Sequence, residues 1–397
     1  MSRPSVVTRW AGVGAVLLVT VLVVACTAPA PPGGTTTTTS LPGDPSSPVI
    51  SSFVAIGSGG PAPLTVALRW TISDPSDLEM VCELDTDGDG TYDQTIVSCT
   101  SETVRTVDVP TPGTTTVGLR VSDGASPAVT RTVTVVAGAP ASEPFDITLL
   151  FVGSFTPVRT AAFNAAAARW SEVIHTGLPN LSLNYAAGGC GADAAAFSGT
   201  IDDVLITASV TAIDGPGKVL ASAGPCYYRT ADGLALAGAM QFDVADIGNL
   251  ENSGDLEDVV LHEMGHVLGI GTLPGWSGNQ SGAGTSTSAF IGPRAQGAWQ
   301  ELGGSGAVPV ENNGVPGTTD SHWRESVFDR ELMTGYEDAG NDPLSRLTVA
   351  ALGDLGYGVN LTAAEAFLLP LPSVRMPALR ESAGPTERLL LPVGGVG

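Results

Sequence analysis

Two patterns of hydrophobic and polar positions divide the chain near residue 140. Between residues 48 and 138, short runs rich in β-branched residues alternate with Gly, Pro and Asp. This punctuation is typical of short antiparallel strands and predicts an all-β sandwich over 48–138. The predicted strands span residues 49–54, 64–70, 103–107, 115–121 and 130–136.

Residues 144–371 follow a mixed pattern that predicts an α+β domain. An apolar stretch at 145–152 is a strand candidate, and Thr156 and Pro157 then offer an N-cap followed by proline at the first helical position. The alanine-rich segment 158–174 continues as a helix. Further strands are expected at 181–185, 204–210, 219–223 and 239–242. The expected fold class is therefore multidomain, with a β-sandwich followed by an α+β domain.

Both ends of the chain have compositions unsuited to a folded core. Two arginines precede an uncharged apolar stretch at 11–25, which is shorter than the ~20 residues of a membrane-spanning helix and predicts a signal peptide over 1–25. Residues 26–47 are rich in Pro, Thr and Ser and predict an extended linker. Residues 372–397 are rich in Pro and Gly, so we expect a flexible C-terminal tail.

The end of the signal peptide carries a short motif. Val23-Val24-Ala25-Cys26 resembles the lipobox of bacterial lipoproteins, in which a diacylglycerol is attached to the cysteine after cleavage just before it. The resemblance implies an exported protein that is lipid-anchored at the extracellular face of the bacterial cell membrane. The alternative is an ordinary signal peptide in which Cys26 has no such role.

Composition agrees with export and excludes some partners. The 397 residues include 17 Lys and Arg against 40 Asp and Glu, so the formal charge of −23 argues against nucleic acid as a partner. An exported protein can keep disulfides. Four cysteines besides Cys26 allow three connectivities, and we expect one pair in each half of the chain. The expected pairs are Cys82–Cys99 and Cys190–Cys226.

A candidate metal site lies at 262–266. Carboxylates begin the segment 255–271 and apolar residues recur at helical spacing, which predicts a helix that ends near Gly269. His262 and His266 then lie about 40° apart around the helix axis and about 6 Å apart along it, so both imidazoles can bind one zinc ion. Glu263 is placed to act on a water at that ion as a general base.

Hydrolysis at zinc needs a third protein ligand and an open fourth position. The compact metzincin pattern would place a histidine three residues after Gly269, but Thr272 stands there. His322 is the remaining histidine candidate. A glutamate ligand of the thermolysin type is the alternative, and the eligible residues are Glu301, Glu311, Glu325 and Glu331.

The order of these motifs resembles the leishmanolysin family of zinc metalloproteases. His-Glu-x-x-His-x-x-Gly is followed by a long insertion, then by His-Trp at 322–323 and Glu-Leu-Met-Thr-Gly at 331–335. The likeness spans about residues 145–360 and implies a metzincin-type catalytic domain with His322 as third ligand. It also implies a Met-turn at Met333 beneath the metal and a helix over 344–357.

The resemblance implies a zinc metalloendopeptidase that hydrolyses extracellular protein or peptide bonds. One catalytic Zn²⁺ would be held by His262, His266 and His322, with Glu263 as general base. Tyr336 is a candidate oxyanion donor. Latent members of the family block the zinc with a pro-segment cysteine, and this chain has no spare cysteine for that purpose. The alternative is a surface-anchored binding or adhesion protein with an inactive peptidase domain.

The β-sandwich resembles an immunoglobulin-like domain of the polycystic-kidney-disease (PKD) type, best at 119–124. Within it, Asp85, Asp87 and Asp89 alternate with small residues as in a calcium-binding loop. The twelfth position of that pattern is Ile96 instead of a bidentate glutamate. A Ca²⁺ site and a plain acidic β-turn are therefore both open.

Overall fold

The structure is a computed structural model that describes residues 36–37, 47–100, 102–313, 317–336, 340–370 and 386–397. The expected signal peptide, Cys26 and most of the expected linker lie outside these residues. Among the described residues, no helix is both long and apolar enough to cross a membrane.

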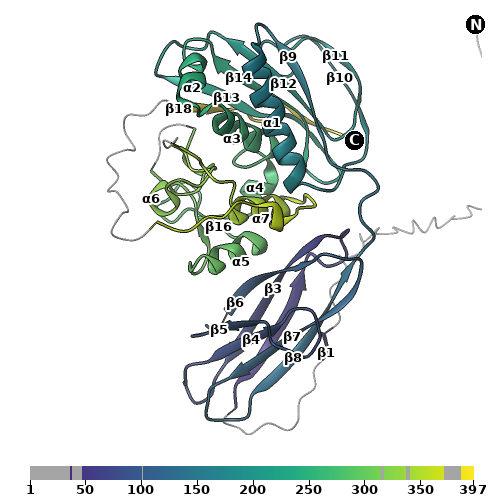
Figure 1. Ribbon diagram of the computed structural model, residues 1–397, viewed down its shortest axis with the longest axis vertical. Coiled ribbons are helices and arrows are strands. Elements are labelled where there is room, and N and C mark those ends of the chain that lie inside the picture. Colours follow the sequence, from purple (N-terminus) through teal and green to yellow (C-terminus); the bar gives the residue numbers. More distant parts are fainter. Residues whose placement is uncertain (1–35, 38–46, 101, 314–316, 337–339, 371–385) are drawn as a thin grey trace, which may run out of the picture. The chain divides into compact units, whose positions relative to one another are not determined.

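The described chain up to residue 137 consists of two antiparallel sheets around one core (Figure 1). One sheet has the order β2-β3-β6, and the other has the order β1-β8-β7-β4-β5. The strands are β1 (Thr36–Thr37), β2 (Val49–Ile56), β3 (Leu64–Ser73), β4 (Val81–Asp85), β5 (Gln94–Ile96), β6 (Glu102–Val109), β7 (Gly113–Ser122) and β8 (Val129–Ala137). The five expected strands are present, and β4 and β5 are additional.

Alternation along the strands builds this core. Val66, Leu68 and Trp70 of β3 face inward and are fully buried, together with alternate residues of β7. The Cys82–Cys99 disulfide lies at the edge of the same core, and the indole Nε1 of Trp70 donates to Cys99 Sγ at 3.4 Å. The disulfide thus ties β4 to the core of the facing sheet.

The described chain from residue 145 onward is organised around a mixed sheet. Its order is β18-β13-β14-β12-β9, and β19 also pairs with β13. β12 runs parallel to β9 and β14, whereas β13 runs antiparallel to β14. The strands are β9 (Ile147–Val152), β12 (Val204–Thr211), β13 (Val219–Arg229), β14 (Ala235–Asp243), β18 (Thr386–Leu389) and β19 (Gly394–Val396).

The two faces of this sheet bury different partners. Val204, Ile206 and Ala208 of β12 belong to the core shared with helices α1 (Pro157–Val173) and α3 (Leu256–Leu268), which pack against each other. The intervening Leu205 belongs to a smaller core beneath the hairpin β10 (Leu181–Tyr185) and β11 (Phe197–Ile201), where Cys190 and Cys226 form the second disulfide. Helix α3 packs against β13 and β14, so the sheet fixes the position of this helix.

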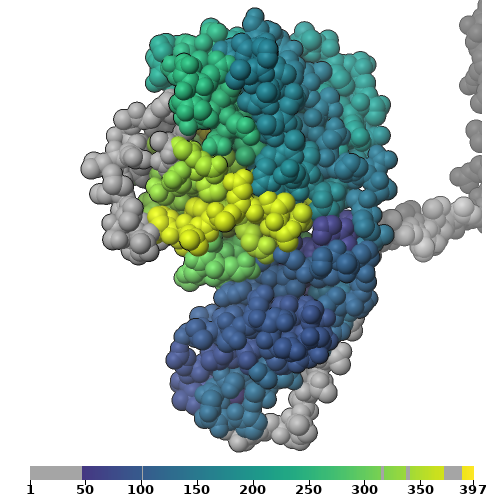
Figure 2. Space-filling model, viewed as in Figure 1, coloured from purple at the N-terminus to yellow at the C-terminus, as the bar shows by residue number. Residues whose placement is uncertain are grey.

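Shorter elements complete this part of the chain, and α2 packs against α3. They are α2 (Ile247–Ser253), α4 (Pro274–Gly278), β15 (Gln280–Ser281), β16 (Ala289–Phe290), α5 (Pro293–Glu301), β17 (Val308–Pro309), α6 (Glu325–Phe328), α7 (Arg346–Leu355) and the 3₁₀ turn η1 (Leu361–Ala363). The yellow segment that follows α7 lies at the surface in Figure 2. There Arg169 of α1 donates to the Ala363 carbonyl at 2.7 Å, which fixes this segment against α1.

Local sequence signals explain where α1 and α3 begin and end. The hydroxyl of Thr156 accepts from the Arg159 N–H at 3.2 Å, so α1 begins at the predicted cap. α3 ends at Gly269, whose φ of 119° lies in the left-handed region that glycine adopts without strain. This glycine turns the chain back immediately after His266.

The structure differs from expectation at 386–397, which we predicted to be part of a flexible tail. These residues form β18 and β19, and both strands run parallel to β13 along its outer edge. The overall Pro and Gly content concealed a short strand-forming run at 386–391 that lies between two prolines. An edge strand offers unpaired backbone groups, and this run satisfies them.

Replacing Cys82 and Cys99 together by serine tests the contribution of the first disulfide. A cross-link that closes 17 residues is expected to stabilise by about 3 kcal/mol, so β3 and β7 should lose about that much protection in native-state hydrogen exchange. Amides of α1 serve as the internal reference and should not change. Unchanged protection of β3 and β7 would contradict the stabilising role of this bridge.

Candidate metal centre and active site

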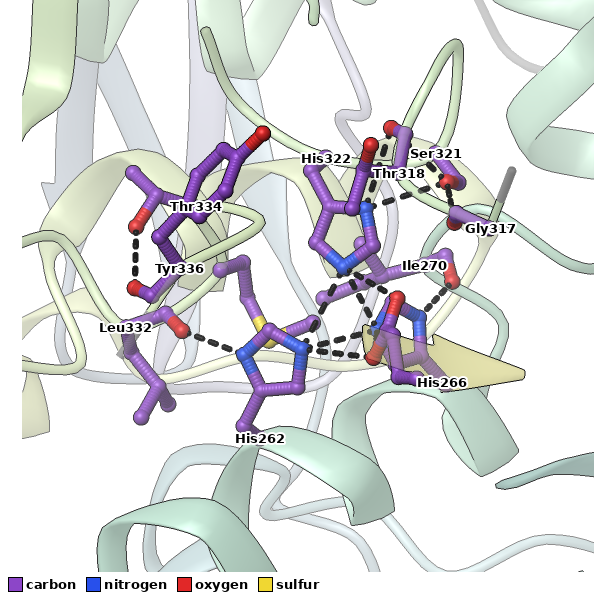
Figure 3. A network of polar contacts seen from close by, with 12 residues as sticks. His262, His266, Ile270, Gly317, Thr318, Ser321, His322, Leu332, Thr334 and Tyr336 are labelled. Carbon is purple, nitrogen blue, oxygen red and sulfur yellow. Dashed lines mark hydrogen bonds and ion pairs between the residues drawn. The ribbon is translucent and has the colours of Figure 1, made fainter. Parts of the chain in front are cut away.

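Helix α3 places two of the three candidate histidines. His262 and His266 lie one turn apart on the side of α3 that faces the site, and their rings point toward each other (Figure 3). Their Nε2 atoms are 3.0 Å apart. His266 is fully buried and the side chain of His262 is 16% exposed, so the pair lies at the inner end of a pocket.

The structure brings His322 to the same point. This residue lies 56 positions after His266 in the chain, between β17 and α6. Its Nε2 is 3.0 Å from that of His266 and 3.2 Å from that of His262. Three imidazoles from two distant segments therefore converge through the same ring nitrogen (Figure 3).

The other nitrogen of each ring determines its tautomer. Nδ1 of His262 lies 2.6 Å from the Leu332 carbonyl, that of His266 lies 2.8 Å from the Ile270 carbonyl, and that of His322 lies 3.1 Å from the Thr318 carbonyl. A carbonyl only accepts, so Nδ1 of His262 and of His266 carries the proton. Nδ1 of His322 also lies 3.0 Å from Ser321 Oγ, but the hydrogen of that hydroxyl is directed at the Gly317 carbonyl at 2.6 Å, so this Nδ1 carries a proton as well. In the neutral rings the three Nε2 lone pairs then face one another, an arrangement that positive charge among them would stabilise, supplied by a bound cation or by a protonated ring beside a carboxylate.

The spacing fits a tetrahedral metal ion. With Zn–N bonds of about 2.0–2.1 Å, ligand nitrogens are separated by about 3.3 Å, close to the observed distances between Nε2 atoms. Carbonyl acceptors behind imidazole ligands are the outer partners that such sites typically use. The donor set and its hydrogen bonds therefore fit an ion with a preference for imidazole nitrogen.

A fourth group joins the three imidazoles. The carboxylate of Glu387 on β18 lies 2.7 Å from Nε2 of His322, 3.1 Å from that of His262 and 3.2 Å from that of His266. His262, His266, His322 and Glu387 together could hold one ion. Glu387 is not among the site residues that the sequence predicts, because a single acidic residue in a Pro- and Gly-rich segment carries no motif.

Charge and burial oppose each other in this cluster. Burial disfavours the Glu387 carboxylate, but the neighbouring histidines hold the pKa of that carboxyl well below its usual value. Burial likewise disfavours protonated His262, yet the hydrogen bond and charge of Glu387 raise the pKa of His262 to about 9. Burial lowers the pKa of His266 to about 4. The cluster therefore favours an ionised carboxylate beside positive charge.

Glu263 follows His262 on α3 and is only 2% exposed. Its Oε2 is buried without a hydrogen-bond partner, which is costly unless a water or substrate group completes the site. Burial raises the pKa of the Glu263 carboxyl well above its usual value, and the charge of Glu387 adds to the rise. Glu263 is therefore a carboxyl with an open acceptor beside the histidine cluster.

A tight turn at 331–334 supports the site from below. The Leu332 carbonyl accepts from His262, and a Cβ built on Gly265 would lie only 2.8 Å from the sulfur of Met333. Met333 is fully buried, so its thioether packs against α3 between the two histidine positions. This is the place that the family resemblance implies for the Met-turn.

Buried Glu331 holds this turn in place. Its carboxylate accepts from the Met333 N–H at 2.8 Å and from the hydroxyls of Ser345 and Thr348 at 2.6 and 2.5 Å. Thr348 in turn accepts from Nε1 of Trp323, the neighbour of His322, at 2.8 Å. One network thus connects α7, the turn and the segment that carries His322.

Tyr336 lines the pocket that opens beside the cluster. The other lining residues are Leu220, Asp258, Val259, His262, Glu263, Leu332, Thr334, Gly335, Asp342 and Glu387. The cavity has a volume of about 60 Å³, which is room for a few waters. Tyr336 therefore lies where an oxyanion donor could act, although its hydroxyl is not part of the histidine cluster.

None of the four glutamates weighed as an alternative third ligand belongs to the histidine cluster. Glu301 accepts from the Thr106 N–H, Glu311 accepts from Asn312 and Asn313, and Glu331 supports the turn. The backbone N–H of Glu325 donates to the Glu311 carboxylate at 3.0 Å. The third imidazole position is occupied by His322 instead.

The acidic loop between β4 and β5 forms a hydrogen-bonded turn. Asp85 accepts from the Gly88 and Gly90 N–H groups at 2.7 and 3.0 Å, and Asp87 and Asp89 each accept from the backbone two residues on. The three carboxylates also lie close enough to share an ion. The turn is therefore observed, and calcium binding stays a prediction.

Comparisons with known proteins agree with this chemistry over a short region. The family model of the leishmanolysin peptidases matches residues 305–370, which include His322, Met333 and α7 but not His262 or His266. This match suggests a metalloprotease. A solved structure, a PKD domain of an M14-like peptidase from a Thermoplasmatales archaeon, is 19% identical over 24% of this chain and 98% of that chain, with a TM-score of 0.21. A comparison with curated proteins found no match.

Replacing Glu331 by alanine tests the support of the turn. The N–H groups of Met333 and Ser345 and the hydroxyls of Ser345 and Thr348 would lose their buried acceptor, so we expect the free energy of unfolding to fall by about 3 kcal/mol and the affinity for zinc to weaken. Urea denaturation and competition with a zinc chelator measure the two effects. Glu172→Ala removes an exposed ion pair and should cost at most about 0.5 kcal/mol. Equal effects of the two variants would contradict the assigned role.

Proposed function

We propose that the chain is a zinc-dependent endopeptidase with a metzincin-type catalytic domain. The observation that carries the proposal is the convergence of three Nε2 atoms within 3.2 Å of one another, with every Nδ1 directed at a backbone carbonyl. The match to the leishmanolysin family supports it at the segment that supplies His322. The proposal treats His322 from that segment and the two histidines of α3 as ligands of one metal ion.

In this proposal His262, His266 and His322 hold the metal, and the carbonyl behind each ring keeps its lone pair directed at the ion. A bound zinc ion supplies a Lewis acid and lowers the pKa of water toward neutrality. Glu387 must leave for a water and a substrate carbonyl to enter, since catalytic zinc sites keep one open position.

Glu263 supplies the proton transfers. Its unpartnered Oε2 accepts a proton from the attacking water and delivers that proton to the leaving nitrogen. The raised pKa of its buried carboxyl suits a group that must both take up and release a proton. Tyr336 donates to the oxygen that becomes negative as the carbonyl is attacked.

Protein or peptide substrates are proposed to bind in extended form along β13. β18 and β19 lie along the outer side of β13 in this structure, and their displacement would make β13 an edge strand of the sheet that packs on α3. Edge strands bind extended peptides through their free backbone groups. The β-sandwich is proposed to be a PKD-like accessory domain. A binding protein with an inactive peptidase domain is the second candidate, which the carboxylate at the fourth position favours.

Export and lipid anchoring through Cys26 complete the proposal. They rest on the apolar stretch at 11–25 and on the lipobox-like motif that ends it. Anchoring through the linker would keep the catalytic domain at the extracellular face of the membrane.

The Glu263→Gln variant tests the catalytic assignment. Loss of the general base should lower kcat/KM on casein by about 10²- to 10⁴-fold while zinc content, measured by mass spectrometry, stays at one ion per chain. The control is Glu257→Gln, an exposed position in the first turn of α3, which should change neither. Glu263→Gln and Glu257→Gln are each measured twice, once with Glu387 unchanged and once in a Glu387→Gln background. The second background is needed because the Glu387 carboxylate lies against the three histidines.

A chelator should abolish cleavage by the unmodified chain, and added zinc should restore it. Cleavage that survives Glu263→Gln, or that is insensitive to the chelator, would contradict the mechanism. An absence of bound zinc would contradict the proposed function itself.

The Cys26→Ser variant tests anchoring in a bacterial host that processes lipoproteins. The unmodified chain should fractionate with membranes, and its N-terminal peptide should carry the mass of a diacylglycerol on cysteine. The serine variant should lose both properties. Equal distribution of the two proteins between membrane and soluble fractions would contradict lipid attachment at Cys26.

A further inference from the structure

We propose that residues 386–397 inhibit the site of their own chain. Glu387 would take the fourth position around a metal held by the three histidines, and β18 and β19 occupy the side of β13 along which an extended substrate is proposed to bind. This inference rests on the proposed function. It answers a question that the cysteine pattern leaves open, namely what keeps such a site latent when no spare cysteine is present.

The first argument is the position of the Glu387 carboxylate. It lies within 3.2 Å of all three Nε2 atoms, and its side chain is only 10% exposed. One oxygen would complete a four-ligand site with three histidines, and closed four-ligand zinc sites have no place for an attacking water. The group beside the imidazoles is thus a side-chain carboxylate, which contains no peptide bond that the site could hydrolyse.

The second argument is the pairing of the segment with β13. Ala221 is opposite Glu387 and Tyr227 is opposite Gly394, so β18 and β19 together follow most of the strand. Between them the Leu390 N–H donates to the Ala223 carbonyl at 2.7 Å, and the Val393 N–H donates to the Cys226 carbonyl at 2.8 Å. The backbone acceptors that an incoming peptide would use are already taken.

The third argument is that β13 is shaped to receive this segment. A Cβ on Gly224 would collide with the Leu390 carbonyl, and the φ of 156° at Gly224 also lies where glycine is favoured. Farther along, the Thr230 N–H donates to the Val396 carbonyl at 2.9 Å, and its hydroxyl donates to the Gly397 carbonyl at 2.6 Å. The segment is therefore held at both ends of the edge and at its centre.

The segment and the site belong to one chain, so inhibition needs no partner and is independent of protein concentration. The effective concentration of a tethered segment is high, which favours occupancy even when each contact is modest. Cleavage or displacement of the segment would free the edge of β13 and the fourth position together. Latency and activation would then be two states of the same edge strand.

The experiment compares the full chain with Glu387→Gln and Glu387→Ala. The matched control is Arg388→Ala, the next residue on β18, whose side chain is exposed. Each protein is loaded with Co²⁺ in place of zinc, and its visible absorption is titrated with acetohydroxamic acid, a small chelating ligand. Cleavage of a quenched peptide by the zinc-loaded proteins is measured in parallel.

We expect both Glu387 variants to shift the Co²⁺ spectrum, to bind acetohydroxamate at least 10-fold more tightly and to cleave at least 10-fold faster. Arg388→Ala should resemble the unmodified chain in all three measurements. Hydrogen exchange at 386–397 should rise in the Glu387 variants, because the metal anchor of the segment is lost.

Three outcomes would overturn the inference. If spectrum, probe affinity and cleavage are all unchanged while the unmodified chain is active, Glu387 does not inhibit and the proposed function stands. If the spectrum shifts but no variant cleaves, Glu387 is a structural ligand and not an inhibitor, and the second candidate function is favoured. If no variant binds Co²⁺ or zinc, the proposed function and the inference both fail.

Discussion

Three imidazole lone pairs facing one another set the constraint on which the rest of this site depends. Neutral rings do not approach through their lone pairs at about 3 Å unless positive charge lies between them. Each Nδ1 is bound to a backbone carbonyl, so the rings cannot relieve the contact by exchanging tautomers. His262, His266, His322 and Glu387 together could therefore hold one cation in the core of this domain.

The surrounding fold serves to keep those carbonyls in place. The Ile270 carbonyl belongs to the turn that follows Gly269, and the Leu332 carbonyl belongs to the turn held by Glu331. The sheet positions α3 from above, while Met333 packs against Gly265 from below. Rigid outer contacts of this kind orient metal ligands and preserve their geometry when a substrate enters.

The parts of the site that could be predicted from the sequence are those formed by residues close together in the chain. The spacing of His262 and His266 on an amphipathic helix, and the glycine that ends it, follow from local rules. His322 could be chosen over four glutamates only through the family resemblance, because a contact across 56 residues depends on the tertiary fold. The strands β4 and β5 were missed because they are short, polar and interrupted by the acidic loop.

Glu387 was beyond such reasoning for a different reason. Strand pairing at 386–397 depends on the free edge of β13, which no periodicity within that segment reveals. The composition of residues 372–397 predicts flexibility, but pairing with the edge of β13 orders residues 386–397 as strands. The same edge explains how one strand could serve a substrate in one state and the segment of its own chain in another.

The most direct test of the account is a crystal of the full chain grown with zinc and measured on both sides of the zinc absorption edge. The account predicts one anomalous peak within bonding distance of Nε2 of His262, His266 and His322, with a Glu387 oxygen at the fourth position. A peak that does not touch His322, or no peak among these rings at all, would contradict it.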